Sequence, residues 1–186
     1  TIAAEEARVL PTLRDVLDER PVFDAAAIDA PLGLHDEPGD EFRQCDREAR
    51  EFVGWPRAAA IYGVASRRGY EFEDGAEAAE IETWMNRADQ RRHRWLYEAA
   101  TEIQPHHARR IAPAHPDVSF TAMNGDTPLR TSPWHDDGRA ERLELIRQQL
   151  PGVDDVVMMR ELAWRPRCER IISVNSRARS TLDISR

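Results

Sequence analysis

Cysteine is scarce in this chain and lysine is absent. Only two cysteines, Cys45 and Cys168, occur among the 186 residues, and they lie far apart without a partner spacing. This pattern indicates neither a disulfide framework nor a thiolate metal site, so we expect reduced thiols. Arginine supplies every strongly basic side chain. The absence of lysine indicates first a coding bias towards G and C, and only weakly a preference for phosphate recognition by the guanidinium fork.

Long apolar runs and common catalytic motifs are missing as well. No stretch approaches the roughly 18 to 20 apolar residues that cross a bilayer, and the first residues lack a signal-peptide pattern. We therefore expect a soluble, cytoplasmic protein with no membrane partner. The sequence has no GxGxxG, P-loop, GxSxG, HExxH or CxxC motif. These absences argue against the common nucleotide-binding, acyl-transfer, zinc-protease and redox classes.

The charge of the chain is negative and unevenly distributed. A net charge of -8 argues against a protein that holds nucleic acid by bulk charge alone. Residues 156–186 carry about +4, which leaves about -12 for residues 1–155. Since the length suits one domain of ordinary size, we predict a single domain over 1–155 followed by a divergent basic tail over 156–186.

Hydrophobic periodicity predicts helices beside a buried strand, and therefore an α/β fold. The charged and imidazole side chains between Arg87 and Arg94 are expected to face solvent. The predicted elements are an amphipathic helix within 4–20 that begins or breaks at Pro11, a buried strand at 22–28, a polar helix at 40–54 stopped by Gly54, one or two helices over 74–105 with Asp74 as N-cap and Trp95 among the buried positions, a loop entering a short strand over 114–125 with a turn at Asn124-Gly125, and a helix from Asp136 that ends before Pro151-Gly152.

Asp29 is the first candidate site residue. It stands where the predicted strand ends and a Pro-Leu-Gly turn begins. Open α/β sheets place their chemistry at the carboxyl ends of strands, so a carboxylate here is a candidate working group. An aspartate before such a turn also commonly caps backbone N–H groups. Both interpretations remain open from this residue alone.

Charged residues of the 40–54 helix form a second candidate. Arg43, Asp46, Arg47 and Arg50 are three or four residues apart, so they lie on neighbouring faces and local ion pairs are expected. The alternative is that the arginines meet phosphate or support an acidic centre.

Histidines and paired acids supply weaker candidates. His106, His107 and His115 allow a zinc-dependent hydrolase, although their spacing fits no tight signature. Asp154 and Asp155 follow Pro151-Gly152, where they could cap a last helix or bind metal. The pair Asp136-Asp137 precedes a helix and is explained most simply by favourable interaction with the helix N-terminus.

Four segments, taken in order, are similar to one known family. Together they resemble the family called domain of unknown function 429, described as predicted RNase H-like nucleases, over residues 27 to about 155. The segments are AIDAPLGL (27–34), RQCDREAREFVG (43–54), HPDVSF (115–120) and GRAERLELI (138–146).

The resemblance implies an RNase H-like fold, a mixed sheet with flanking helices, and a metal-dependent nuclease. In such folds acids hold two divalent cations that activate water and stabilise the leaving oxygen. Oxygen ligands suit Mg or Mn. The implied roles are Asp29, Asp117 and Asp155 as catalytic acids, Asp29, Asp154 and Asp155 as metal ligands, and Arg43, Arg47 and His115 as groups that bind a nucleic-acid substrate, with Asp46 supporting them.

The sequence also departs from the family pattern. The family's opening strands, with an early Asp-Gly that carries the first carboxylate, should precede Thr1, so we expect a sheet incomplete at its N-terminus. The acidic start at Asp154-Asp155 continues as DDVVMMREL, with Met158 and Met159 where the family pattern has a later aspartate. With these departures, the resemblance predicts either an active metal-dependent nuclease or a nuclease that is inactive or truncated. The alternative is a non-catalytic interaction or regulatory protein on the same scaffold, docking an acidic partner or nucleic acid through its basic tail.

Overall fold

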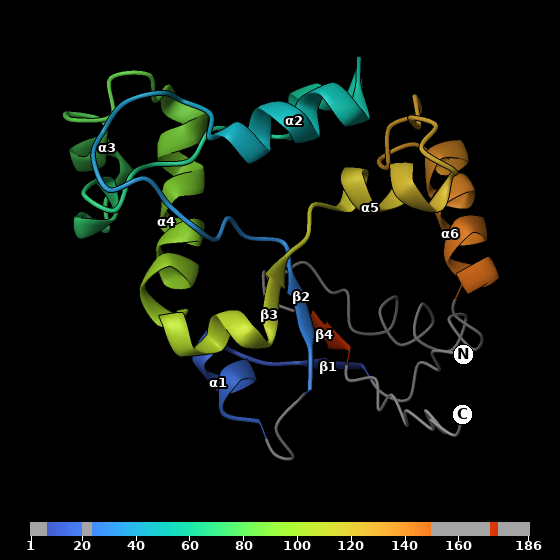
Figure 1. The fold of residues 1–186 in the computed structure, drawn as a ribbon, viewed down its shortest axis with the longest axis horizontal. Helices are drawn as coiled ribbons and strands as arrows, with labels where there is room; N and C mark the ends of the chain where they lie inside the picture. Colours follow the sequence, from blue (N-terminus) through green and yellow to red (C-terminus); the bar gives the residue numbers. More distant parts are fainter. Residues whose placement is uncertain (1–6, 20–23, 150–171, 175–186) are drawn as a thin grey trace, which may run out of the picture. The chain divides into compact units, whose positions relative to one another are not determined.

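The computed structural model describes residues 7–19, 24–149 and 172–174 (Figure 1). The chain divides into two compact units, one made of residues 25–142 and the other of residues 1–24 and 143–186. The predicted boundary at residue 155 lies outside the described residues. None of the described helices is both long and apolar enough to span a membrane.

The unit that contains the N-terminal residues has a short antiparallel sheet and a capped helix. Strand β1 (Ala7–Val9) pairs with β4 (Ile172–Val174). Helix α1 (Leu13–Leu17) begins after Thr12, whose side chain accepts a hydrogen bond from the Asp15 backbone N–H while the Asp15 carboxylate accepts one from Thr12 N. The predicted break near Pro11 is confirmed, but residues 7–9 form a strand and not a helix.

The larger unit contains a parallel strand pair. Strand β2 (Ala26–Ile28) pairs with β3 (Ile111–Pro113), and Ile28 lies opposite Pro113 (Figure 1). A strand is confirmed for residues 26–28 of the predicted range 22–28, but it is not buried, since Ala26 and Ile28 are half-buried and Ala27 is exposed. Strand β3 was not predicted. Helices and strands occur together in the described residues, which agrees with the α/β part of the predicted class.

Helices supply most of the larger unit. They are α2 (Gln44–Val53), η1 (Arg57–Ala60), η2 (Gly69–Glu71), α3 (Gly75–Ala78), α4 (Arg87–Glu102), η3 (Pro105–Arg109), α5 (Pro116–Met123) and the first turns of α6 (Asp136–Gln149). Gly54 ends α2 with a φ of 67°, as predicted from the glycine stop. Asn86 caps α4 by accepting hydrogen bonds from the backbone N–H groups of Ala88 and Asp89.

Two local predictions in this unit are wrong. Residues 116–123 form helix α5, not a strand, because Pro116 occupies the first turn and the preceding His115 caps it through its side chain. The predicted turn at Asn124-Gly125 is present, with Gly125 at a φ of 63°. Within α4, Asp89 and His93 are buried and do not face solvent.

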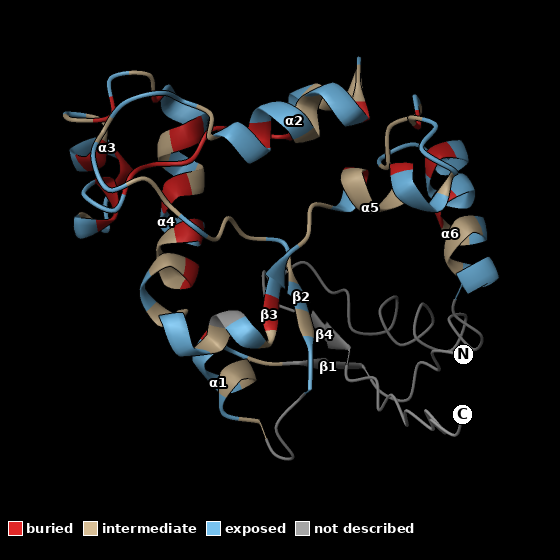
Figure 2. Ribbon diagram, in the orientation of Figure 1, coloured by how far each residue is buried: buried red, intermediate tan, exposed pale blue. Residues whose placement is uncertain are grey.

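The core lies between α4 and the segment that precedes α3. Val64, Ala65, Tyr70 and Leu96 form its buried centre. Figure 2 shows the buried residues concentrated on one face of α4, on α3 and on the chain beside them. His93 is 2% exposed, stacks on the Tyr70 ring at 4.7 Å and contacts the Phe72 carbonyl through Nε2 at 2.8 Å. This packing explains why an imidazole in a charged stretch is buried.

Candidate functional site

The parallel strands bring two predicted site residues to the same edge. Asp29 follows β2 directly, and His115 lies two residues beyond the end of β3. Since Ile28 and Pro113 are paired, the chain leaves both strands side by side, and Ala114 N donates a 2.8 Å hydrogen bond to the Ile28 carbonyl oxygen. The carboxyl ends of parallel strands are where α/β folds place binding sites.

A cavity of about 290 Å³ opens at this edge. Its walls come from the turns after β2 and β3, from α2, from the segment after η1 and from α5. Its polar lining includes Asp29, Arg43, Asp46, Tyr62 and His115, and Cys45 also lies on the wall. The remaining lining is largely apolar, so the cavity combines a few polar groups with an apolar wall, as small binding sites commonly do.

Asp29 is the carboxylate of this pocket without a bound partner. It makes no hydrogen bond or ion pair with another residue in the part of the chain that the structure describes. Burial in the pocket raises the pKa of its carboxyl, His115 acts in the opposite direction, and the negative charge of Asp117 raises the pKa further. The residue is still exposed overall, so water screens part of this effect.

All three nitrogens of the Arg43 guanidinium donate hydrogen bonds within the protein. Its Nε and Nη2 donate to the two carboxylate oxygens of Asp46 at 2.7 and 2.6 Å, and its Nη1 donates to the Leu32 carbonyl oxygen at 2.6 Å. Burial would lower the pKa of the guanidinium, but the hydrogen bond and charge of Asp46 raise it. This pair therefore ties the start of α2 to the turn after β2 and shapes the pocket.

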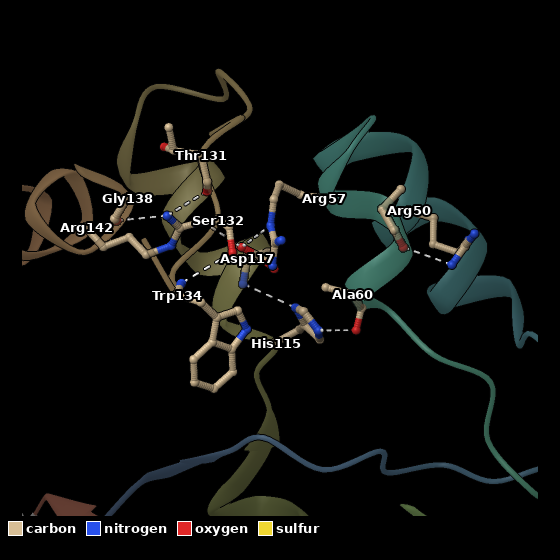
Figure 3. A network of polar contacts seen from close by, with 11 residues as sticks. Arg50, Arg57, Ala60, His115, Asp117, Thr131, Ser132, Trp134, Gly138 and Arg142 are labelled. Atoms are coloured by element: carbon tan, nitrogen blue, oxygen red, sulfur yellow. Dashed lines mark hydrogen bonds and ion pairs between the residues drawn. The ribbon is translucent and has the colours of Figure 1, made fainter. Parts of the chain in front are cut away.

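Asp117 lies between two arginines at the start of α5 (Figure 3). Its Oδ2 accepts from Arg57 Nη2 at 2.8 Å, and its Oδ1 accepts from Arg142 Nη2 at 3.0 Å. Burial alone would raise the pKa of this carboxyl, but the hydrogen bonds from both guanidinium groups bring it below its usual value. The carboxylate joins η1, α5 and α6, which indicates a structural role in this arrangement.

The His115 ring is fixed by two backbone groups. Its Nδ1 accepts a hydrogen bond from Asp117 N at 3.2 Å, and its Nε2 lies 3.2 Å from the Ala60 carbonyl oxygen (Figure 3). Because a carbonyl oxygen only accepts, Nε2 must carry the proton in this contact. Both nitrogens are engaged, so neither is available to a metal ion in this arrangement.

The other predicted residues lie elsewhere. Arg47 is outside the pocket lining and makes an exposed 3.4 Å pair with Asp40. His106 and His107 lie in η3 with their rings in contact but tilted by 50°, and among the described residues no group of three or more potential ligands could hold a metal ion. This arrangement gives no support to the zinc alternative. Asp154 and Asp155 lie outside the described residues, so their roles as ligands stay predictions.

Several residues of the site were not predicted. Tyr62 lines the pocket, and burial raises the pKa of its hydroxyl, with Asp29 raising it further. Arg57 and Arg142 hold Asp117 from positions 60 and 25 residues away in sequence. No sequence pattern indicates such distant partners. Tyr62 lies in the stretch of residues 55–73, whose alternation was too weak to predict an element.

Comparisons with known proteins give one match. A family model described as protein of unknown function (DUF429) matches residues 2–175. This confirms the resemblance inferred for residues 27 to about 155 and extends it at both ends. A search of curated proteins and a search of solved structures found no match.

Proposed function

The chain belongs to the DUF429 family, and from that premise we propose that it is a metal-dependent phosphodiester hydrolase of RNase H-like fold acting on nucleic acid. The Asp29 pocket is the proposed site. The observation that carries the proposal is an electrostatic contrast among three carboxylates. Asp46 and Asp117 each have guanidinium partners, whereas Asp29 has none among the described residues. A cation in the pocket would supply the missing positive charge.

Among the described residues Asp29 alone would bind the proposed divalent cation, since no group of three or more potential ligands is present there. Mg²⁺ commonly keeps several water ligands and uses one or two carboxylates together with substrate phosphates. Asp29 would hold the ion, and Asp154 and Asp155 stay predicted ligands outside the described residues. When bound, the ion would activate water and offset the charge that develops on the leaving oxygen.

Side chains of the pocket would position the substrate. The Tyr62 hydroxyl is protonated at neutral pH, since its pKa lies above the ordinary value of 10, so it can donate a hydrogen bond to a phosphate oxygen. The Arg43–Asp46 pair holds the Leu32 turn against α2 and thereby fixes the pocket wall beside Asp29. The backbone contacts of His115 hold the turn after β3 in place.

A non-catalytic binding protein on the same scaffold is the second candidate. It is favoured by the commitment of Arg43, Asp46 and Asp117 to internal ion pairs, because these groups then serve structure and not chemistry. The two candidates differ in one respect that is simple to measure. Only the hydrolase requires Asp29 and a divalent cation for product to form.

A cleavage assay tests the proposal. The full chain is incubated with end-labelled single-stranded and double-stranded DNA and RNA in Mn²⁺, in Mg²⁺ and in EDTA. Asp29→Asn is the test variant. Asp36→Asn is its matched control, since the Asp36 side chain is 87% exposed and outside the pocket lining.

We expect metal-dependent cleavage by the wild type and by Asp36→Asn. Asp29→Asn should be slower by about 100-fold or more, because even residues that only support a metal ligand cost about 10- to 100-fold. Cleavage by Asp29→Asn at the wild-type rate, or no cleavage of any substrate by the wild type, would refute the hydrolase. Binding of the same substrates without cleavage would favour the second candidate.

A further inference from the structure

A second concave surface lies between α3 and α4 in the larger unit, away from the Asp29 pocket lining. Its cavity has a volume of about 520 Å³. We name this surface the α4 groove. It is lined by Glu73, Asp74, Gly75, Ala76, Arg87, Gln90, Arg91, Arg94 and Trp95. The groove is built on two helices that approach closely, because a Cβ added at Gly75 would lie 2.1 Å from the Gln90 carbonyl oxygen.

Three arginines form a row along this groove. Arg87, Arg91 and Arg94 are exposed, and none makes an ion pair or hydrogen bond with a residue that the structure describes. Their spacing of four and three residues places them on one helix face, about 6 and 4.5 Å apart along the axis. Like charges at this spacing destabilise a helix, so the row has no explanation in the stability of α4.

The arginines of α4 divide into two kinds. Arg92 donates to the Asp89 carboxylate at 2.7 Å and lies over the Tyr62 ring at 4.3 Å, so it is held by the protein. Arg87, Arg91 and Arg94 remain available to an anion. Guanidinium groups in this state form strong bidentate hydrogen bonds with phosphate.

An exposed aromatic side chain stands at the end of this row. Trp95 is 59% exposed and lines the groove, although its position in the helix predicted a buried residue. A large exposed aromatic ring beside free guanidinium groups is the combination that proteins use for single strands, whose phosphates meet arginine and whose bases stack on the ring. A base within a duplex has no free face for such stacking.

The opposite wall is acidic. Glu73 is exposed, and one oxygen of Asp74 accepts a 2.6 Å hydrogen bond from Ala76 N. Carboxylates repel phosphate but accept hydrogen bonds from the exocyclic amino group of a base such as cytosine. The groove therefore offers a basic side for a phosphate backbone and an acidic side for base edges.

We propose that the α4 groove binds single-stranded nucleic acid, with Arg87, Arg91 and Arg94 on the phosphates and Trp95 stacked on a base. This binding needs no metal ion and does not depend on the proposed chemistry at Asp29. The site is local, so it is consistent with the net charge of -8, which excludes binding by bulk charge.

Fluorescence anisotropy with the full chain tests the groove. The probe is a labelled 12-nucleotide single-stranded DNA, titrated in EDTA so that no metal-dependent cleavage occurs. The test variant replaces Arg87, Arg91 and Arg94 with glutamine. Its matched control replaces three exposed arginines outside the groove, Arg67, Arg130 and Arg139, and so changes the net charge equally. Circular dichroism checks that each variant is folded.

The groove variant should lose at least tenfold in affinity, and the slope of log K against log salt should fall by about 2, near 0.7 for each lost phosphate contact. Trp95→Ala should lose about five- to 150-fold. Asp36→Asn, whose side chain is 87% exposed and lines neither the groove nor the Asp29 pocket, should bind as the wild type does. Because the titration contains EDTA, its outcome is independent of the metal-dependent cleavage proposed above. Equal loss in the control variant, equal affinity for duplex DNA, or full competition by polyglutamate would overturn the proposal.

Discussion

Replacing Asp117 with alanine should destabilise the larger unit strongly. The carboxylate is 6% exposed and accepts hydrogen bonds from Arg57, 17% exposed, and from Arg142, 7% exposed. Removing one partner of a buried ion pair leaves uncompensated charge and typically costs 3–5 kcal/mol. Because Arg57 keeps some contact with water, we expect a loss of about 3 kcal/mol, near the lower end of that range.

Thermal and urea unfolding of the full chain measure this loss. A decrease of about 3 kcal/mol corresponds to a Tm lower by about 6 to 12 °C for a protein of this size. The matched control is Asp136→Ala, which removes a carboxylate that is 93% exposed and paired with Arg139. Such an exposed pair contributes about 0–1 kcal/mol. A loss below about 1 kcal/mol for Asp117→Ala would refute the assignment of this network as a structural connection.

The loss of stability caused by Asp117→Ala should depend on pH. The folded-state pKa of Asp117 is depressed, so its contribution to stability is present above the unfolded pKa, near 3.9, and disappears as the pH falls through the folded pKa. The stability difference between wild type and Asp117→Ala should therefore be constant near neutral pH and shrink below about pH 4. A difference that stays constant down to pH 2 would contradict the ion pairing.

Three further predictions concern the rest of the larger unit. Gly138→Ala should cost about 1–3 kcal/mol in urea unfolding, because its Cβ would lie 2.0 Å from the Ser132 carbonyl oxygen, whereas Gly39→Ala, with open space, should be near neutral. The pKa of Asp29 is raised in the folded state, so the stability that its protonated carboxyl contributes is lost as the pH rises through the folded pKa. Above that pH, Asp29→Asn should gain stability relative to the wild type. A difference in unfolding free energy between the two proteins that stays the same from pH 3 to 7 would contradict this prediction. Cys45 is exposed and lines the Asp29 pocket, so in a Cys168→Ser background a bound phosphodiester should slow its alkylation; an unchanged rate at saturating ligand would exclude binding there.

Local signals in the sequence predicted much of the helical structure. Gly54 and the alternation of apolar and charged residues mark α2, and Asp74 caps α3 as expected. Such features depend on neighbours three or four residues away, which the sequence makes visible. Helix α5 was missed because its β-branched and aromatic residues favour a strand, while the burial of Thr121 and the ion pairs of Asp117 stabilise a helix.

The candidate site was predicted only in part, because several of its contacts join residues far apart in the sequence. Asp29 and His115 do line one pocket, as the family resemblance implied by assigning both to one site. The partners of Asp117 could not be predicted, because a contact between residues 25 or 60 positions apart leaves no periodic signal. Trp95 was expected in the core from its position in α4, yet it is exposed, since Leu96 and Ala99 supply the buried face of that helix.

Isothermal titration of Mn²⁺ into the full chain, with Asp29→Asn and Asp36→Asn in parallel, tests most directly the central claim that the Asp29 pocket binds a divalent cation. We predict saturable binding to the wild type and to Asp36→Asn, and its loss in Asp29→Asn. Equal binding by all three proteins, or no binding by any of them, would contradict the assignment of Asp29 as a metal ligand.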